Sequence, residues 1–141
     1  MTGTWYPPSL GTGGVLIEAQ LFTNPPFKMT EHDPTGRSAH EPGAKLDGGK
    51  IRASLVLGGF SRALEHVAAV GTYGAAKYTD NGWRSVPNGQ ERYTDALWRH
   101  LLQEAQGLEC DPESHLFHAA HAAWNALARL ELMLQQLEVQ P

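Results

Sequence analysis

The chain has 141 residues, a formal net charge of -4 and a sequence pI near 5.9. This length suffices for one hydrophobic core, and the acidic balance argues against sequence-independent binding to long nucleic acid. The single cysteine, Cys110, excludes an intramolecular disulfide, and no run reaches the ~18 apolar residues of a membrane helix. The first ten residues, MTGTWYPPSL, lack the order of a signal peptide, so we expect a cytoplasmic protein.

Residues 1–46 are predicted to form a long irregular arm. They are rich in Pro, Gly, Thr and Asp, and their one apolar stretch, Val15 to Phe22, could be a short strand or one helical arm. An all-α domain is predicted to follow over residues 47–141, where apolar residues begin to recur at three- and four-residue steps.

Three helices are predicted in this domain. The first lies near residues 57–77, and a turn with Asp-Asn-Gly and Pro-Asn-Gly signals follows it. The second covers residues 93–105, with Gly107 as its C-terminal stop. At Asp111 a capping residue precedes Pro112 and Glu113, which predicts a third helix from there to near Glu138. The predicted fold class is therefore all-α, a bundle of three to four helices.

The last predicted helix carries a stripe of leucines. Leu127, Leu130, Leu134 and Leu137 recur at three- and four-residue steps, and the helix is longer than one small domain needs. The stripe predicts a bundle that is completed by a second copy of the chain.

Polar side chains that could bind a metal ion gather around the second and third helices. His118, His121 and Asn125 share one face of the third helix, because their spacing confines them to an arc of roughly 60°. Antiparallel helices face each other near their connection, so four further groups can converge on that face: His100, Glu104, Asp111 and Glu113. The alternative interpretation is a packing feature, in which the imidazoles hydrogen-bond between helices and the acids are only caps.

A second group of residues is basic, and a triphosphate needs such cations to neutralise its charge. Its members are Lys50, Arg52, Lys77, Arg84, Arg92 and Arg99. The alternative is ordinary solvated surface, which explains most single Lys and Arg residues. The DGGK sequence before Ile51 lacks the frame of a Walker loop, which excludes a P-loop enzyme. Trp83 and the other aromatic residues are expected to be core or interface anchors, although one could cover a base.

Four motifs in order resemble one known family: DGGK, GAxKYxxxxW, RYxxALxRH and DPESxxxHxxHxxxN. Together they span residues 47–132, about two thirds of the chain, and they resemble the phage dATP/dGTP diphosphohydrolases of the MazZ type, within the all-α MazG-like nucleotide pyrophosphohydrolases. The resemblance implies a dimer or a dimer of dimers, two or three Mg²⁺ or Mn²⁺ ions, and hydrolysis between the α- and β-phosphates. It also implies a role in phages whose DNA replaces adenine by 2-aminoadenine. In the cytoplasm of the host, dGMP released from dGTP would feed synthesis of the modified nucleotide.

The chain departs from this family at the metal ligands. MazG relatives carry an ExxE and an ExxD pair on adjacent helices, and neither pair is intact here. His118 and His121 stand at the second position, the first is replaced by the neighbourhood of Asp95, Arg99 and His100, and Glu65 and Glu104 are possible substitutes.

These observations predict hydrolysis of dGTP, dATP or both to the monophosphate and pyrophosphate. Lys77 and Arg99 are predicted to stabilise charge on the departing pyrophosphate. The predicted metal ligands are Glu104, Asp111, Glu113, His118 and His121. Nucleotide binding is assigned to Lys50, Arg52, Lys77, Trp83, Arg84, Arg99, His100 and Asn125. Two rival hypotheses are a nucleotide-binding module without catalysis and a purely structural helical oligomer.

Overall fold

The computed structural model describes residues 30–138, and the chain divides into two compact units between Arg52 and Ala53. The apolar stretch predicted at residues 15–22 lies outside the described residues. Residues 30–138 contain helices and two isolated β-bridges but no strand, so the all-α prediction is confirmed. The proposed boundary at residues 46 and 47 stays a prediction.

The described part of the first unit is a compact loop organised by Asp33. This buried carboxylate accepts hydrogen bonds from the backbone and hydroxyl of Thr35, at 2.7 and 2.6 Å, and from the backbone N–H of Lys45 at 2.7 Å. The backbone N–H of Gly48 donates to the carbonyl of His32 at 2.8 Å and closes the loop. Residues 30–52 therefore hold together through polar contacts without any helix.

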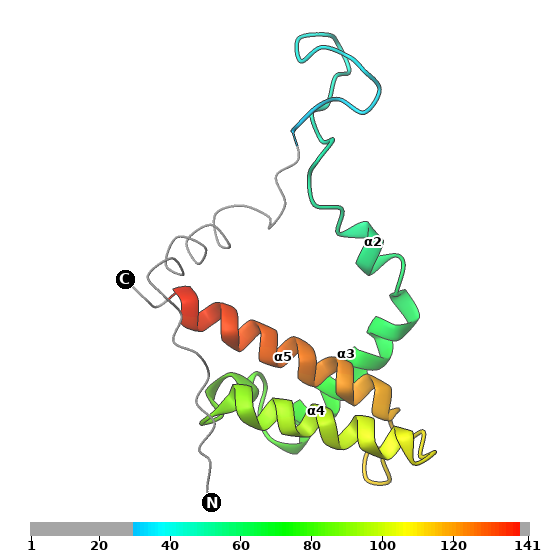
Figure 1. Cartoon of the computed structure of the whole chain (residues 1–141), viewed down its shortest axis with the longest axis vertical. Coiled ribbons are helices and arrows are strands. Elements are labelled where there is room, and N and C mark those ends of the chain that lie inside the picture. The colour runs from blue at the N-terminus through cyan, green and yellow to red at the C-terminus, as the bar shows by residue number, and fades with distance from the viewer. Residues whose placement is uncertain (1–29, 139–141) are drawn as a thin grey trace, which may run out of the picture. The chain divides into compact units, whose positions relative to one another are not determined.

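The second unit is a helical bundle whose central element is α5. Its elements are α2 (Ser54–Leu57), α3 (Ser61–Lys77), the 3₁₀ helix η1 (Gly82–Ser85), α4 (Gly89–Ala105) and α5 (His118–Glu138). Helices α4 and α5 run antiparallel side by side, and α3 also packs against α5 (Figure 1). No helix among the described residues is long and apolar enough to cross a membrane.

The first two predicted helices differ from the structure at their starts. The first predicted helix is interrupted at Gly58 and Gly59, so that α2 and α3 are separate. Helix α4 begins at Gly89, four residues earlier than predicted, because Asn88 takes a left-handed conformation with φ 54° and ends the preceding turn. Its predicted end is confirmed, since Gly107 follows α4 with φ 85°.

The prediction of a helix start at Asp111 is wrong, because α5 begins at His118. The Asp111 carboxylate does accept the backbone N–H groups of Glu113 and Ser114, as a capping residue would. However, His115 takes φ 59°, which a continuing helix does not allow, and Asp111 N–H donates to the Leu116 carbonyl at 2.9 Å. The capping signal therefore organises one tight turn within a loop.

The core of the bundle is built from small apolar side chains and several polar ones. Its buried apolar side chains are Val70, Ala120, Ala122 and Ala128. Gly71 on α3 allows a close approach, since a Cβ there would lie 3.0 Å from the indole nitrogen of Trp124. The face of α5 that points into the bundle carries three buried polar residues: His118, His121 and Asn125. Imidazoles thus occupy a position where a helical bundle ordinarily buries leucine.

Candidate functional site

The loop between α4 and α5 brings polar groups over the first turn of α5. An isolated antiparallel β-bridge between Cys110 and Phe117 pairs the two ends of the loop. The His118 N–H also donates to the Glu109 carbonyl at 2.8 Å. Inside the loop, the Ser114 hydroxyl donates to the Asp111 carboxylate at 3.1 Å. The loop is therefore a fixed support for Asp111.

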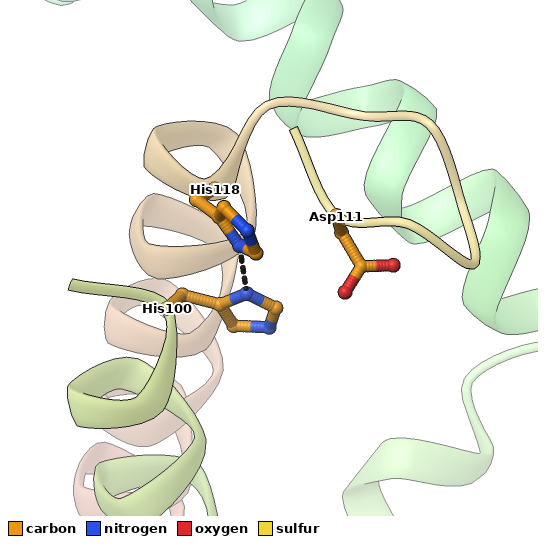
Figure 2. Close-up of side chains that lie close together, drawn as sticks. All are labelled: His100, Asp111 and His118. Carbon is orange, nitrogen blue, oxygen red and sulfur yellow. Dashed lines mark hydrogen bonds between the residues drawn. The ribbon is translucent and has the colours of Figure 1, made fainter. Parts of the chain in front are cut away.

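Three imidazoles meet beneath this loop, one from α4 and two from α5. The Nδ1 atoms of His100 and His118 are 2.9 Å apart, and Figure 2 shows Asp111 beside this pair. His100 also stacks on His121, with ring centroids 4.4 Å apart and planes 11° from parallel. The Nε2 atom of His121 lies 2.8 Å from the Ser114 hydroxyl. The loop, α4 and α5 thus all contribute side chains to one polar cluster, which consists of His100, Asp111, Ser114, His118 and His121.

His118 is the most deeply buried member of this cluster, with 1% of its surface exposed. Its Nε2 atom is buried and has no hydrogen-bond partner among the described residues. An unsatisfied buried polar group costs about 1–3 kcal/mol, so the network is one partner short.

Burial favours the neutral form of two imidazoles of the cluster, those of His100 and His121. It lowers the pKa of His100 to about 4, and the neighbouring His121 and His118 add to the effect. Burial also lowers the pKa of His121. For Asp111, burial raises the pKa, but hydrogen bonds from Ser114 and Glu113 outweigh it and keep the pKa below its usual value. The cluster therefore offers imidazole lone pairs and an ionised carboxylate at neutral pH.

Such a set of donors suits a divalent metal ion. His100, Asp111 and His118 each offer a ligand atom, and these atoms lie within 4.8 Å of one another. Imidazole and carboxylate together accommodate Mn²⁺, whereas Mg²⁺ prefers oxygen ligands and retains water. Of the two ions implied by the resemblance, Mn²⁺ fits this donor set and Mg²⁺ does not.

A groove of about 1140 Å³ runs from this cluster along α3, η1, α4 and α5. Its volume lies slightly above the ~300–1000 Å³ of ordinary ligand pockets, so the groove is large enough for a nucleotide. His100 and His121 line it beside three cations: Lys77, Arg92 and Arg99. Cations and imidazoles therefore share one concave surface.

Aromatic side chains form part of the groove's wall. Trp124 makes edge-to-face contacts with Trp83 and Tyr93, at centroid distances of 5.9 and 5.7 Å. The Tyr93 hydroxyl donates to the Trp83 carbonyl at 3.1 Å, which anchors η1 to α4. This wall provides apolar surface that a base could pack against.

Glu113 is placed away from the imidazoles and forms an ion pair with Lys77. The Lys77 ammonium donates to the Glu113 carboxylate, which lowers the pKa of Glu113 and raises that of Lys77. The carboxylate also raises the pKa of Tyr73 by accepting its hydroxyl hydrogen bond. This pair ties the α4–α5 loop to the end of α3.

Most of the residues predicted for the site meet in the second unit. The cluster or the groove includes Lys77, Trp83, Arg99, His100, Asp111, His118, His121 and Asn125. Asn125 lines the groove while its amide donates to the His121 carbonyl at 2.8 Å.

Besides Glu113, which pairs with Lys77 away from the predicted metal site, four predicted site residues lie elsewhere. Glu104 is exposed on α4 and does not line the groove. Arg84 stacks on Trp83 at 4.9 Å and lies 3.7 Å from the Glu131 carboxylate, in a separate hollow. Lys50 and Arg52 belong to the first unit, where Lys50 pairs with Glu31 at 3.7 Å.

The sequence patterns assigned no role to two groups that the structure brings to the site: Ser114 links Asp111 to His121, and Tyr73 lines the groove. Arg92 and Asp95, which the sequence analysis mentioned without a site assignment, also line the groove. His100 was predicted both to converge on the face of His118 and to bind the nucleotide, and it lies within the metal-ligand cluster.

The comparisons with known proteins define the class of protein. The chain belongs to the family described as "dATP/dGTP diphosphohydrolase, N-terminal", whose model matches residues 40–141. This finding confirms the family expected from the motifs.

A particular relative is the dATP/dGTP diphosphohydrolase of Salmonella phage PMBT28. It is 40% identical to this chain over 81 residues, which cover 57% of this chain and 26% of the phage protein. The chain thus spans about a quarter of the length of that relative. No solved structure matches the chain.

The dual role of Asp111 leads to a stability prediction. Asp111→Ala removes the acceptor of three hydrogen bonds within the loop and should lower the free energy of unfolding by about 1–2 kcal/mol, as for loss of a helix cap. Asp111→Asn keeps an oxygen at that position and should cost clearly less. Urea unfolding in the presence of a chelator measures both variants, and equal losses would show that the carboxylate does not hold the turn.

Proposed function

We propose that this chain hydrolyses purine deoxynucleoside triphosphates, dGTP, dATP or both, to the monophosphate and pyrophosphate in a metal-dependent reaction. The observation that carries the proposal is the continuity of the imidazole–carboxylate cluster with a cationic groove of nucleotide size. The name of the family and that of the phage relative support the same chemistry.

The groove provides complementary charge for a triphosphate. Lys77, Arg92 and Arg99 lie along it, and Arg can hold phosphate oxygens through two parallel hydrogen bonds. Lys77 and Arg99 would neutralise the charge that develops on the departing pyrophosphate, and Asn125 would position a phosphate or the sugar. The Trp83–Trp124–Tyr93 wall would pack against the base.

Divalent ions, two or three in number as the resemblance implies, would polarise phosphate oxygens and lower the pKa of an attacking water. Among the described residues, one cluster of three ligands is present, at His100, Asp111 and His118. The Lys77–Glu113 pair must separate if Lys77 turns to a phosphate, and Glu113 would then become free near the same groove. In a phage that uses 2-aminoadenine, the dGMP product would feed synthesis of the modified nucleotide.

A product assay with a matched pair of arginine variants tests this proposal. With dGTP or dATP and Mn²⁺, we expect monophosphate and pyrophosphate in equal amounts. Arg99→Met should lower kcat/KM about 100-fold, the order expected for one lost charge-stabilising donor. Arg62→Met is the control, because Arg62 is exposed on α3 outside the groove, and it should keep full activity. Stepwise release of orthophosphate, or binding without turnover, would contradict the proposal and favour another phosphatase or a binding module.

The exposed side of α5 supports a second part of the proposal, assembly with another copy of the chain. Leu127 and Leu130 are 52% and 51% exposed, and on α4 Trp98 and Leu102 are 59% and 58% exposed. The leucine stripe lies opposite the inward face that carries His118, His121 and Asn125. Because the buried core of residues 53–137 consists of small side chains, a second copy would supply the missing apolar contacts.

Analytical ultracentrifugation of Leu130 variants measures this association. Leu130→Glu places a charge on the leucine stripe and should shift the protein to a smaller species with a lower Tm. Leu130→Met preserves the side-chain volume and should leave the assembly intact. A wild-type chain that sediments as a monomer at micromolar concentration would refute the assembly.

A further inference from the structure

The His100–His118 pair has the separation that two ligands of one metal ion require. Its Nδ1 atoms lie 2.9 Å apart. With metal–nitrogen bonds of about 2.0–2.1 Å, two nitrogens are about 2.8–3.0 Å apart at right angles around one ion and about 3.3–3.4 Å apart in a tetrahedron. The two rings are thus already spaced as neighbouring ligands.

Asp111 completes a set of three ligands from three different segments. Its carboxylate lies within 4.8 Å of the ligand atoms of His100 and His118, and the turn it organises holds it there (Figure 2). His121 stacks on His100 from the groove side and is fixed by Ser114, so it acts as a positioning residue for that ring.

We propose that His100, His118 and Asp111 form a site for one transition-metal ion of the Mn²⁺, Co²⁺ or Zn²⁺ class and discriminate against Mg²⁺. This inference rests on the proposed function only in that the ion would serve the same groove. Imidazole is a good ligand for borderline metals, whereas Mg²⁺ demands oxygen ligands in a near-octahedral arrangement.

The identity of the ligands has a structural consequence. His100 lies near the end of α4, Asp111 in the loop and His118 at the start of α5, so one ion would tie these three segments together. An ion that binds the folded chain in this way stabilises it against unfolding. This effect can be measured without any nucleotide.

The test is metal titration of the chelator-treated full chain, followed by thermal melting and by the visible spectrum with Co²⁺. We expect the rise in Tm to increase from Mn²⁺ to Co²⁺ to Zn²⁺, as the affinity series of these ions predicts, with no rise for Mg²⁺ at the same concentration. Co²⁺ should give an absorption band that changes when Zn²⁺ displaces it.

Two variants separate ligand loss from misfolding. His100→Gln removes a ligand at a partly exposed position, and Asp111→Asn retains the oxygen that holds the loop. Each should keep a cooperative melt without metal and weaken Co²⁺ binding by about 10-fold or more. His40→Gln, at an exposed histidine of the first unit, should bind Co²⁺ like the wild type.

Equal stabilisation by Mg²⁺ and Zn²⁺, unchanged Co²⁺ binding in both variants, or no binding of any ion would each overturn the inference. These outcomes are independent of hydrolysis. Pyrophosphate release with Mg²⁺ from a chain that binds no Co²⁺ would leave the proposed function standing while removing this site.

Discussion

The packing of α4 against α5 around three imidazoles is the constraint on which the rest of the structure depends. His100, His118 and His121 lie at the loop end of this hairpin, where His100 contacts both of the others. Burial lowers the pKa of His100 and His121, so these two rings are neutral beside the Asp111 carboxylate at neutral pH. A bundle built on such a cluster gains less from hydrocarbon burial than one built on leucine, and its polar groups need partners to compensate.

The loop before α5 carries both structural and chemical roles. Asp111 uses its carboxylate to hold the turn through Glu113 and Ser114, and the same group lies beside the imidazoles. Glu113 lies outside the cluster and pairs with Lys77, and this ion pair joins the loop to α3. These contacts thus connect the elements that bound the groove, while leucines of α5 such as Leu127 and Leu130 remain exposed on its outer face.

Sequence patterns predicted the helices well where apolar periodicity and glycine signals coincide, as at α3 and at the end of α4 beside Gly107. They failed at Asp111, because capping chemistry is local and does not distinguish a single turn from a long helix. The shared face of His118, His121 and Asn125 followed from helical spacing alone. The convergence of His100 on that face followed from the antiparallel pairing of two helices joined by a short connection. The exposed position of Glu104 could not be predicted, since it depends on the rotation of α4 in the bundle.

The most direct measurement is a crystal structure grown with Mn²⁺ and a non-hydrolysable dGTP analogue, with anomalous scattering recorded for manganese. The account predicts a manganese peak within bonding distance of His100, His118 and Asp111, with the triphosphate lying in the groove toward Arg99. A peak bound only by glutamates such as Glu65 or Glu104, with the imidazoles still hydrogen-bonded to each other, would contradict it.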